Sequence, residues 1–141
     1  MRVRAVALLP VFSLFFLSFA AAGEFNAEQQ EVVQAFVVQG RAVYEEDFEL
    51  FRSVVLDEIL FDEVHVLPRE LLFEGLMEET HRDPEGHAKA YDVNRIVSLK
   101  VDGDVAVMVL RDTVAGEQLH RFEFVKQNGS WKWSAWGRVS E

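Results

Sequence analysis

Arg111 and His120 have side chains suited to anion binding and to acid–base chemistry, and they lie on neighbouring segments in the second half of the chain. A guanidinium binds a carboxylate or a phosphate through two parallel hydrogen bonds. A histidine exchanges a proton near neutral pH, so it can act as a general acid or base. The alternative is that both residues are solvated at the end of a sheet, or pair with acidic residues there.

Aromatic residues in the same half of the chain, Phe124, Trp131 and Trp133, suit the floor of a pocket for a planar ligand. Tyr44 is a further candidate, because it is the only tyrosine on an expected helix. The alternative is that the three rings fill the core of a small domain, where large apolar side chains are commonly buried.

One short segment alternates residues that suit a divalent metal: His81, Asp83, Glu85 and His87. No second cluster at a fixed spacing completes a site, and Pro84 and Gly86 are typical of a turn. We therefore expect a solvated loop and no metal site. The sequence also has no phosphate-binding glycine loop and no Ser-His-Asp order, so it predicts no cofactor.

Composition limits the classes of protein in which these residues can act. The 141 residues include 14 Lys and Arg against 24 Asp and Glu, for a net charge of −10, and no cysteine. The lack of cysteine excludes a disulfide scaffold and a thiol nucleophile. An acidic chain without a basic patch is a poor candidate for binding nucleic acid. Half of the residues are hydrophobic, which is too many for a disordered chain and enough for one domain with a core.

Residues 1–22 have the pattern of a secretory signal peptide. Two arginines precede a largely apolar run that ends at Phe19, and the small residues Ala20–Ala22 suit cleavage after Ala22. We expect residues 23–141 to form a single secreted or periplasmic domain that is free of the membrane after cleavage. The alternative is an uncleaved anchor, since the run has about the minimum length that spans a bilayer.

Patterns of hydrophobic residues predict helices in the first half of the chain and strands in the second, which is typical of α+β folds. Asn26 begins the first helix with the residue types of a capping box, Asp47 caps a second, and Pro68 begins a third. Gly40 is expected to end or kink the first helix, and a helical apolar spacing continues to Val55. Short turns then join four strands into an antiparallel meander: 91–101, 105–112, 118–126 and 130–138.

Turn lengths predict which residues lie opposite one another in this sheet. A two-residue turn at Asn128-Gly129 gives three pairs: Phe124 with Trp133, Phe122 with Ala135, and Lys126 with Trp131. The last pair suits a cation–π contact. A two-residue turn at Ala115-Gly116 places Arg111 opposite His120 on the helix-facing side of the sheet, together with Ser98. A three-residue loop in either hairpin would exchange the two faces.

The opposite face of the sheet is also largely apolar, so it needs a cover, and a second copy of the chain is the simplest one. The residues expected at this homodimer contact are Met108, Leu110 and Trp136.

The C-terminal strands resemble those of the nuclear transport factor 2-like superfamily, which includes the SnoaL-like and ketosteroid-isomerase-like proteins. The resemblance rests on the strand start Gly103–Val107 and on the hairpin Phe124–Trp133 with its Asn-Gly turn, and it extends over residues 26–138. It implies a cone-shaped, cystatin-like roll in which N-terminal helices pack on a curved four-stranded antiparallel sheet around a pocket. The superfamily contains enzymes, ligand binders and accessory domains, so the fold does not decide the function.

An apolar pocket without a convincing set of catalytic residues predicts an exported, non-catalytic module that binds a small apolar or anionic ligand, or a partner protein. The alternative is a SnoaL-like isomerase, dehydratase or cyclase that uses His120 with Arg111. The candidate ligand-binding residues are Tyr44, Ser98, Arg111, His120, Phe124 and Trp133.

Overall fold

The computed structural model describes residues 25–112 and 118–139. The predicted signal peptide, residues 1–22, and the predicted turn at Ala115-Gly116 lie outside the described residues. No helix in the described ranges is long and apolar enough to cross a membrane. The helices are α2 (Ala27–Tyr44), α3 (Phe48–Ser53), α4 (Arg69–Arg82), α5 (Pro84–Ala90) and a 3-10 turn (Val93–Arg95). The strands are β1 (Val55–Phe61), β2 (His65–Pro68), β3 (Ile96–Asp102), β4 (Val105–Arg111), β5 (Leu119–Gln127) and β6 (Ser130–Arg138).

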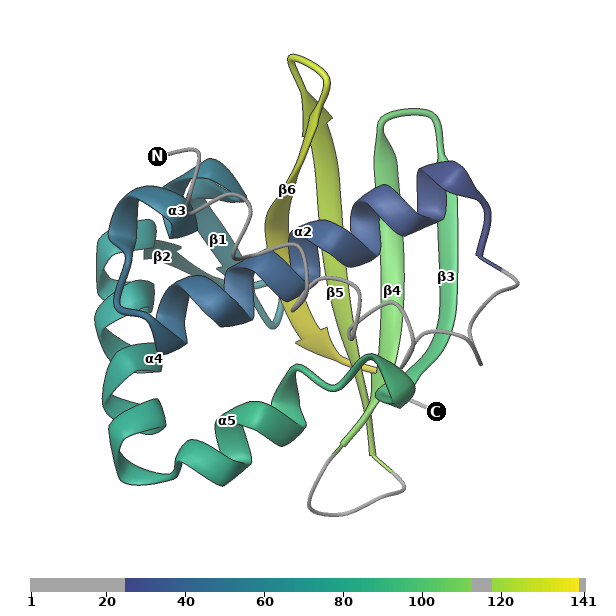
Figure 1. Cartoon of the computed structure of the whole chain (residues 1–141). Helices are drawn as coiled ribbons and strands as arrows, with labels where there is room; N and C mark the ends of the chain where they lie inside the picture. The colour runs from purple at the N-terminus through teal and green to yellow at the C-terminus, as the bar shows by residue number, and fades with distance from the viewer. Residues whose placement is uncertain (1–24, 113–117, 140–141) are drawn as a thin grey trace, which may run out of the picture.

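The described strands form one six-stranded sheet in the order β2-β1-β6-β5-β4-β3 (Figure 1). Neighbouring strands are antiparallel except β1 and β6, which are parallel. The α+β class is therefore confirmed, but the expected four-stranded antiparallel sheet is wrong. Val55, which we expected on a helical stripe, begins β1 and lies opposite Trp133. A partner strand so far along the chain leaves no local pattern from which β1 could be predicted.

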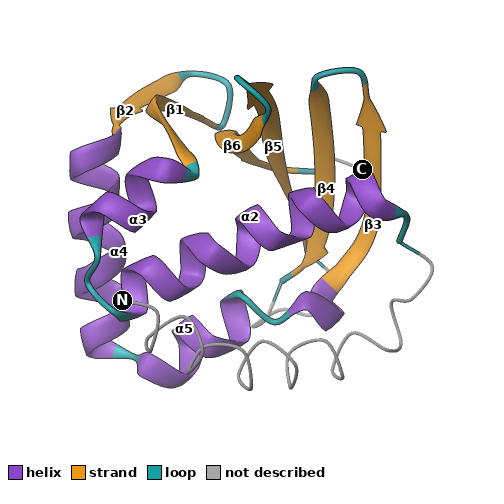
Figure 2. Cartoon of the chain, turned by 45° about the horizontal axis from the view of Figure 1, so that its top comes forward, coloured by secondary structure: helices purple, strands orange, loops and turns teal. Residues whose placement is uncertain are grey.

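Helices α2 to α5 lie on one side of the sheet, and α2 crosses its inner face (Figures 1 and 2). Asn26 begins α2 with the predicted capping box: its side chain accepts from Gln29 N, and the Gln29 side chain accepts from Asn26 N, both at 2.8 Å. Asp47 caps α3 as predicted, accepting from Leu50 N. The prediction that Gly40 could end the first helix is wrong, because α2 continues through it to Tyr44.

The hairpin of β5 and β6 forms around the predicted turn Asn128-Gly129, where φ is 52° and 81°. Such positive values are those that a two-residue hairpin turn requires. The pairs Phe124–Trp133 and Lys126–Trp131 are confirmed, and the Lys126 ammonium lies 5.7 Å from the centre of the Trp131 ring.

A bulge beyond these pairs shifts the register of β5 against β6 by one residue. Phe122 therefore lies opposite Trp136, and the expected pairing of Phe122 with Ala135 is wrong. The shift keeps Trp136 on the same side of the sheet as Phe122, toward the helices.

The register of β4 against β5 also differs from the expected one by a single residue. Arg111 lies opposite Leu119, and Leu110 lies opposite His120. Side chains alternate between the two faces of a strand, so a slip of one residue moves every side chain of β4 to the other face. The pairing of Arg111 with His120 is therefore wrong, and the described strands match the alternative in which the two faces are exchanged.

The same slip corrects the proposed dimer surface. Met108 and Leu110 are fully buried beneath the helices, and Trp136 also faces the helical side. These three residues are not an outer face of the sheet, so the predicted contact through them is wrong. Homodimer formation itself stays a prediction.

Candidate functional site

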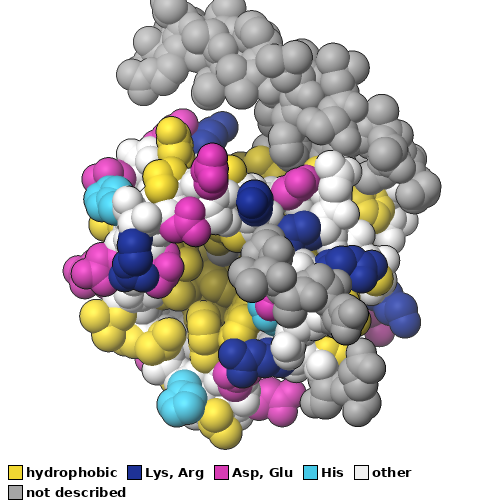
Figure 3. All heavy atoms as spheres, turned by 90° about the horizontal axis from the view of Figure 1, so that it is seen from below, with side chains coloured by type: hydrophobic (Ala, Val, Ile, Leu, Met, Phe, Trp, Pro, Cys, Tyr) yellow, Lys and Arg dark blue, Asp and Glu magenta, His cyan; other side chains and the backbone are white. Residues whose placement is uncertain are grey.

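A cavity of about 410 Å³ opens between α4, α5 and the end of the sheet where β5 begins and β6 ends. Figure 3 looks at the molecule from this side and shows a hollow whose visible depth is hydrophobic. Charged side chains lie around it. This arrangement of an apolar interior with a few polar groups is typical of small-molecule sites.

Aromatic rings from β1, β5 and β6 line one side of the cavity: Phe61, Phe122, Trp133 and Trp136. Phe122 stacks on Trp133 with the ring centres 5.0 Å apart and the planes at 16°. Phe61 lies 5.2 Å from Trp136. The Trp133 indole N–H donates to the Ala135 carbonyl at 2.9 Å, so its polar atom already has a partner. This aromatic floor fits the flat apolar body of a ligand.

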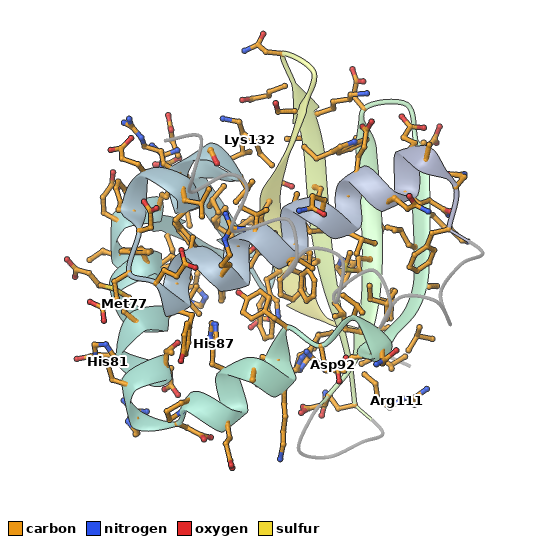
Figure 4. All side chains as sticks on the ribbon, in the orientation of Figure 1. Met77, His81, His87, Asp92, Arg111 and Lys132 are labelled. Carbon is orange, nitrogen blue, oxygen red and sulfur yellow. The ribbon has the colours of Figure 1, made fainter. Side chains whose placement is uncertain are left out.

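Helix α5 forms another wall, and His87 fastens it to the rest of the molecule. In Figure 4 the His87 side chain rises from α5 toward α2. Its Nε2 lies 2.9 Å from the Gly40 carbonyl of α2, and its Nδ1 lies 2.9 Å from the Thr80 hydroxyl of α4. A carbonyl can only accept, so Nε2 carries a proton and donates. One imidazole therefore joins three helices at the edge of the cavity.

Tyr91, directly after α5, continues this wall. Its hydroxyl accepts a hydrogen bond from the Gln39 amide at 2.6 Å, and its ring lies 4.9 Å from that of Phe36. Burial raises the pKa of Tyr91 well above its usual value of 10.0. The phenol therefore stays protonated at physiological pH and acts here as a packing and hydrogen-bonding group.

His120 and Asp112 form an acid–base pair at the sheet end of the cavity. The His120 Nε2 lies 3.5 Å from Asp112 Oδ2, and the imidazole lies 5.1 Å from the Trp136 ring. Burial lowers the pKa of His120 below its usual 6.5, and the Asp112 carboxylate offsets part of that shift. His120 is therefore neutral near pH 7, the state in which it can accept a proton from a bound molecule.

Arg95 completes this end of the cavity. Arg95, Asp112 and His120 together form the polar cluster of the cavity. Arg95 Nε donates to the Arg111 carbonyl at 2.6 Å, and Nη1 donates to the Ala90 carbonyl. Burial lowers the pKa of Arg95, and Asp112 again opposes the shift. The guanidinium thus fastens the end of α5 to the end of β4.

The structure describes all six predicted ligand-binding residues. Two of them line the cavity, His120 and Trp133. Phe124 is fully buried in the core. Tyr44 is 65% exposed at the end of α2 and does not reach the interior.

Ser98 and Arg111 are exposed and lie on the outer face of the sheet. Figure 4 shows Arg111 pointing away from α5. A bulge in β3 turns Ser98 outward while Leu99 remains buried. The structure therefore separates Arg111 from His120, and Asp112 is the charged neighbour of His120 instead.

The segment of alternating histidines and acids is helical, so the expected loop is wrong. Asp83 caps α5 by accepting from Gly86 N at 3.0 Å, and Pro84 begins the helix. His81 points outward, 2.9 Å from Glu46, whereas His87 lies inside (Figure 4). Across residues 25–112 and 118–139 no three His, Asp or Glu side chains are grouped to hold a metal ion.

Sequence reasoning missed several residues of the cavity: His87, Tyr91, Arg95 and Asp112. One signal for the first two was present, because an Asp followed by Pro is typical of a helix start, and Asp83-Pro84 begins α5. A helix there places His87 and Tyr91 four residues apart on one face. No comparable pattern predicts that Arg95 and Asp112 line the cavity, because the register of β4 in the sheet brings these two residues together.

No protein-family model matches the sequence, and no curated protein matches it. Solved structures do match the fold of the chain. An NTF2-like protein of unknown function from Shewanella baltica is 14% identical, with a TM-score of 0.53 over 84% of this chain and 98% of that one. An NTF-2-like protein of unknown function from Silicibacter pomeroyi is 17% identical, with a TM-score of 0.51 over 80% of this chain and 96% of that one.

The third, from Nostoc punctiforme, is a domain of unknown function with a cystatin-like fold. It is 13% identical, with a TM-score of 0.51 over 83% of this chain and 80% of that one. At these identities the likeness concerns the fold alone. The predicted resemblance is therefore confirmed at the level of architecture.

Proposed function

We propose that this protein, which has a nuclear transport factor 2-like fold, is a binding module for a small molecule with a flat, apolar body. The cavity of about 410 Å³, with its aromatic floor, is the observation that carries the proposal. Its size lies in the range of roughly 300–1,000 Å³ that is typical of small-molecule sites. The polar cluster supplies the few polar contacts that orient a ligand in such a site.

Filling the cavity tests this proposal. Ala90 lines the cavity, whereas Ala88 is exposed on the same helix. We expect Ala90→Phe to abolish the binding of naphthalen-2-ylmethanol, a flat uncharged probe, in equilibrium dialysis, and Ala88→Phe to retain it. Leu76→Trp fills the same space from α4 and provides a second variant. Unchanged affinity in either filled variant, with folding verified by circular dichroism, would contradict the proposal.

An acid–base enzyme is the second candidate, and the pair of His120 and Asp112 favours it. A neutral histidine oriented by a carboxylate can remove a proton next to a carbonyl group. The probe 2-tetralone combines an aromatic ring with a ketone that has such protons. An enzyme would speed their exchange with D₂O, measured by NMR, and His120→Gln would remove the acceleration. The same slow exchange with and without the wild-type protein would exclude His120 as a base for ketones of this kind.

We propose further that the protein is exported, because residues 1–22 have the pattern of a signal peptide. Cleavage after Ala22 is tested by the mass of the protein recovered outside the cytoplasm. We also propose that copies of the chain associate through the outer face of the sheet, where β4 presents Val105, Val107 and Val109. The mass in solution tests this association, and a monomer at high concentration would contradict it.

A further inference from the structure

The charges that line the cavity are unequal. Among the described residues, three carboxylates line it, those of Glu79, Asp83 and Asp112, against the single guanidinium of Arg95. The chain as a whole carries a net charge of −10. A ligand that enters the cavity therefore meets a negative potential, which opposes an anion and attracts a cation.

Arg95 is poorly placed to reverse this balance for an anionic ligand. Two of its N–H groups already donate to backbone carbonyls, and its charge interacts favourably with Asp112. A ligand carboxylate would have to compete with these partners. Arg111, the residue on which the expectation of an anionic ligand rested, lies on the outer face of the sheet.

The other carboxylates lie at the far end of the cavity from Arg95. Glu79 lies in the last turn of α4, and Asp83 directly follows that helix and caps α5, where its backbone N–H donates to the Glu79 carbonyl. Asp83 caps the first turn of α5, whereas Arg95 donates to the carbonyl of Ala90, the last residue of the same helix. Glu79 also pairs with Arg82 at 2.6 Å, which offsets part of its charge, and Asp83 accepts from Gly86 N as the cap of α5.

The aromatic floor suits a cation as well as an apolar body. Cations bind over the faces of aromatic rings because the ring face carries partial negative charge, and tryptophan is the strongest of these partners. Trp133 and Trp136 both line the cavity. Carboxylates at one end and indole rings in the floor are groups that suit an organic ammonium ion.

We propose that the cavity selects a flat ligand that bears an ammonium group, with its charge toward Glu79 and Asp83, and that it discriminates against carboxylates. This inference rests on the small-molecule function proposed above and specifies the charge of the ligand. The polar cluster at the other end then contacts the uncharged part of the molecule.

Three naphthalene probes of similar size and different charge test the inference by isothermal titration calorimetry at low ionic strength: naphthalen-2-ylmethylammonium, naphthalen-2-ylmethanol and naphthalene-2-carboxylate. We expect the ammonium to bind about tenfold more tightly than the carboxylate, which is the effect of one favourable charge contact. The alcohol is expected to lie between them. Raising the salt concentration should narrow the difference, because salt screens charges near the surface.

Variants test which carboxylates cause the preference for the ammonium probe. Glu79→Gln combined with Asp83→Asn removes both charges, and asparagine still caps a helix. We expect this double variant to reduce the ratio of ammonium to carboxylate affinity at least about threefold. Glu78→Gln is the matched control, because Glu78 is exposed on the same helix and does not line this cavity. It should leave the ratio unchanged.

The outcomes separate the inference from the function on which it rests. Equal or tighter binding of the carboxylate would overturn the inference and leave a small-molecule site in place. An unchanged ratio in the double variant would also overturn it. Failure of all three probes to bind the wild-type protein would overturn the proposed function together with the inference.

Discussion

The backbone of Gly40 lies directly against the ring of Tyr91: a Cβ built on Gly40 would be 2.5 Å from the Tyr91 Cγ. The carbonyl of the same glycine accepts the hydrogen bond from His87. The C-terminal part of α2 is thus held by two side chains that also line the cavity. The shape of the site depends on the absence of a side chain at residue 40.

We predict that Gly40→Ala lowers the free energy of unfolding by about 1–3 kcal/mol, because the new methyl group overpacks the contact with Tyr91. Gly75→Ala in α4 is the control, since nothing lies within 4 Å of a Cβ there. Alanine is the better helix former, so this control should gain about 0.5–1 kcal/mol. Urea unfolding measures both values, and a stabilised Gly40→Ala protein would show that the contact is not tight.

His87 is predicted to hold α5 in place. His87→Ala removes the hydrogen bonds to Gly40 and Thr80, which should cost about 1–3 kcal/mol of stability. The loss should be local, so amide hydrogen exchange should rise most in α5. His81→Ala, which removes an exposed contact with Glu46, should change little. Equal exchange rates in α5 of the His87→Ala variant and the wild type would refute this role.

The lowered pKa of His120 predicts how the stability of the protein changes with pH. The folded protein binds a proton at this residue less readily than the unfolded chain does. Its contribution to stability is therefore complete above its ordinary pKa of 6.5 and is lost as the pH falls through the lower folded value. The wild type should lose more stability than His120→Gln between pH 6.5 and about pH 5. Parallel pH profiles of the two proteins would contradict this.

The register of β4 predicts opposite effects at two of its residues. Met108 is fully buried, whereas Val105, on the other face, is 46% exposed. Met108→Asp buries an unpaired carboxylate and should prevent folding, since burial of an isolated charge is costly. Val105→Asp should remain folded by circular dichroism. A folded Met108→Asp protein would instead support the register that we expected from the sequence.

The parts of this fold that the sequence predicts well are those governed by neighbouring residues. The capping box at Asn26, the cap at Asp47 and the Asn128-Gly129 hairpin each depend on a few adjacent side chains. The predicted pairs of β5 with β6 hold from this turn as far as the bulge between Glu123 and Phe124. The architecture of helices on a sheet followed from the segregation of these patterns.

The parts that the sequence did not predict depend on contacts between distant residues. Strand β1 exists because β6 pairs with it, and its own residues include adjacent acids that do not alternate as in a half-exposed strand. The candidate site failed for a related reason. A one-residue change in the register of β4 moved Arg111 out of the site, and Asp112 is the residue beside His120.

We propose that a ligand binds on the aromatic floor of the cavity, and the three tryptophans of the chain allow this binding to be tested. Trp133 and Trp136 line the cavity, whereas Trp131 lies beneath Lys126, outside it. The indole N–H signals in a ¹H–¹⁵N NMR spectrum, assigned by single Trp→Phe variants, report on each ring during a titration with naphthalen-2-ylmethylammonium. We predict that the signals of Trp133 and Trp136 move and saturate while that of Trp131 stays in place. Three unmoved signals, or a shift of Trp131 as large as the others, would contradict a binding site in this cavity.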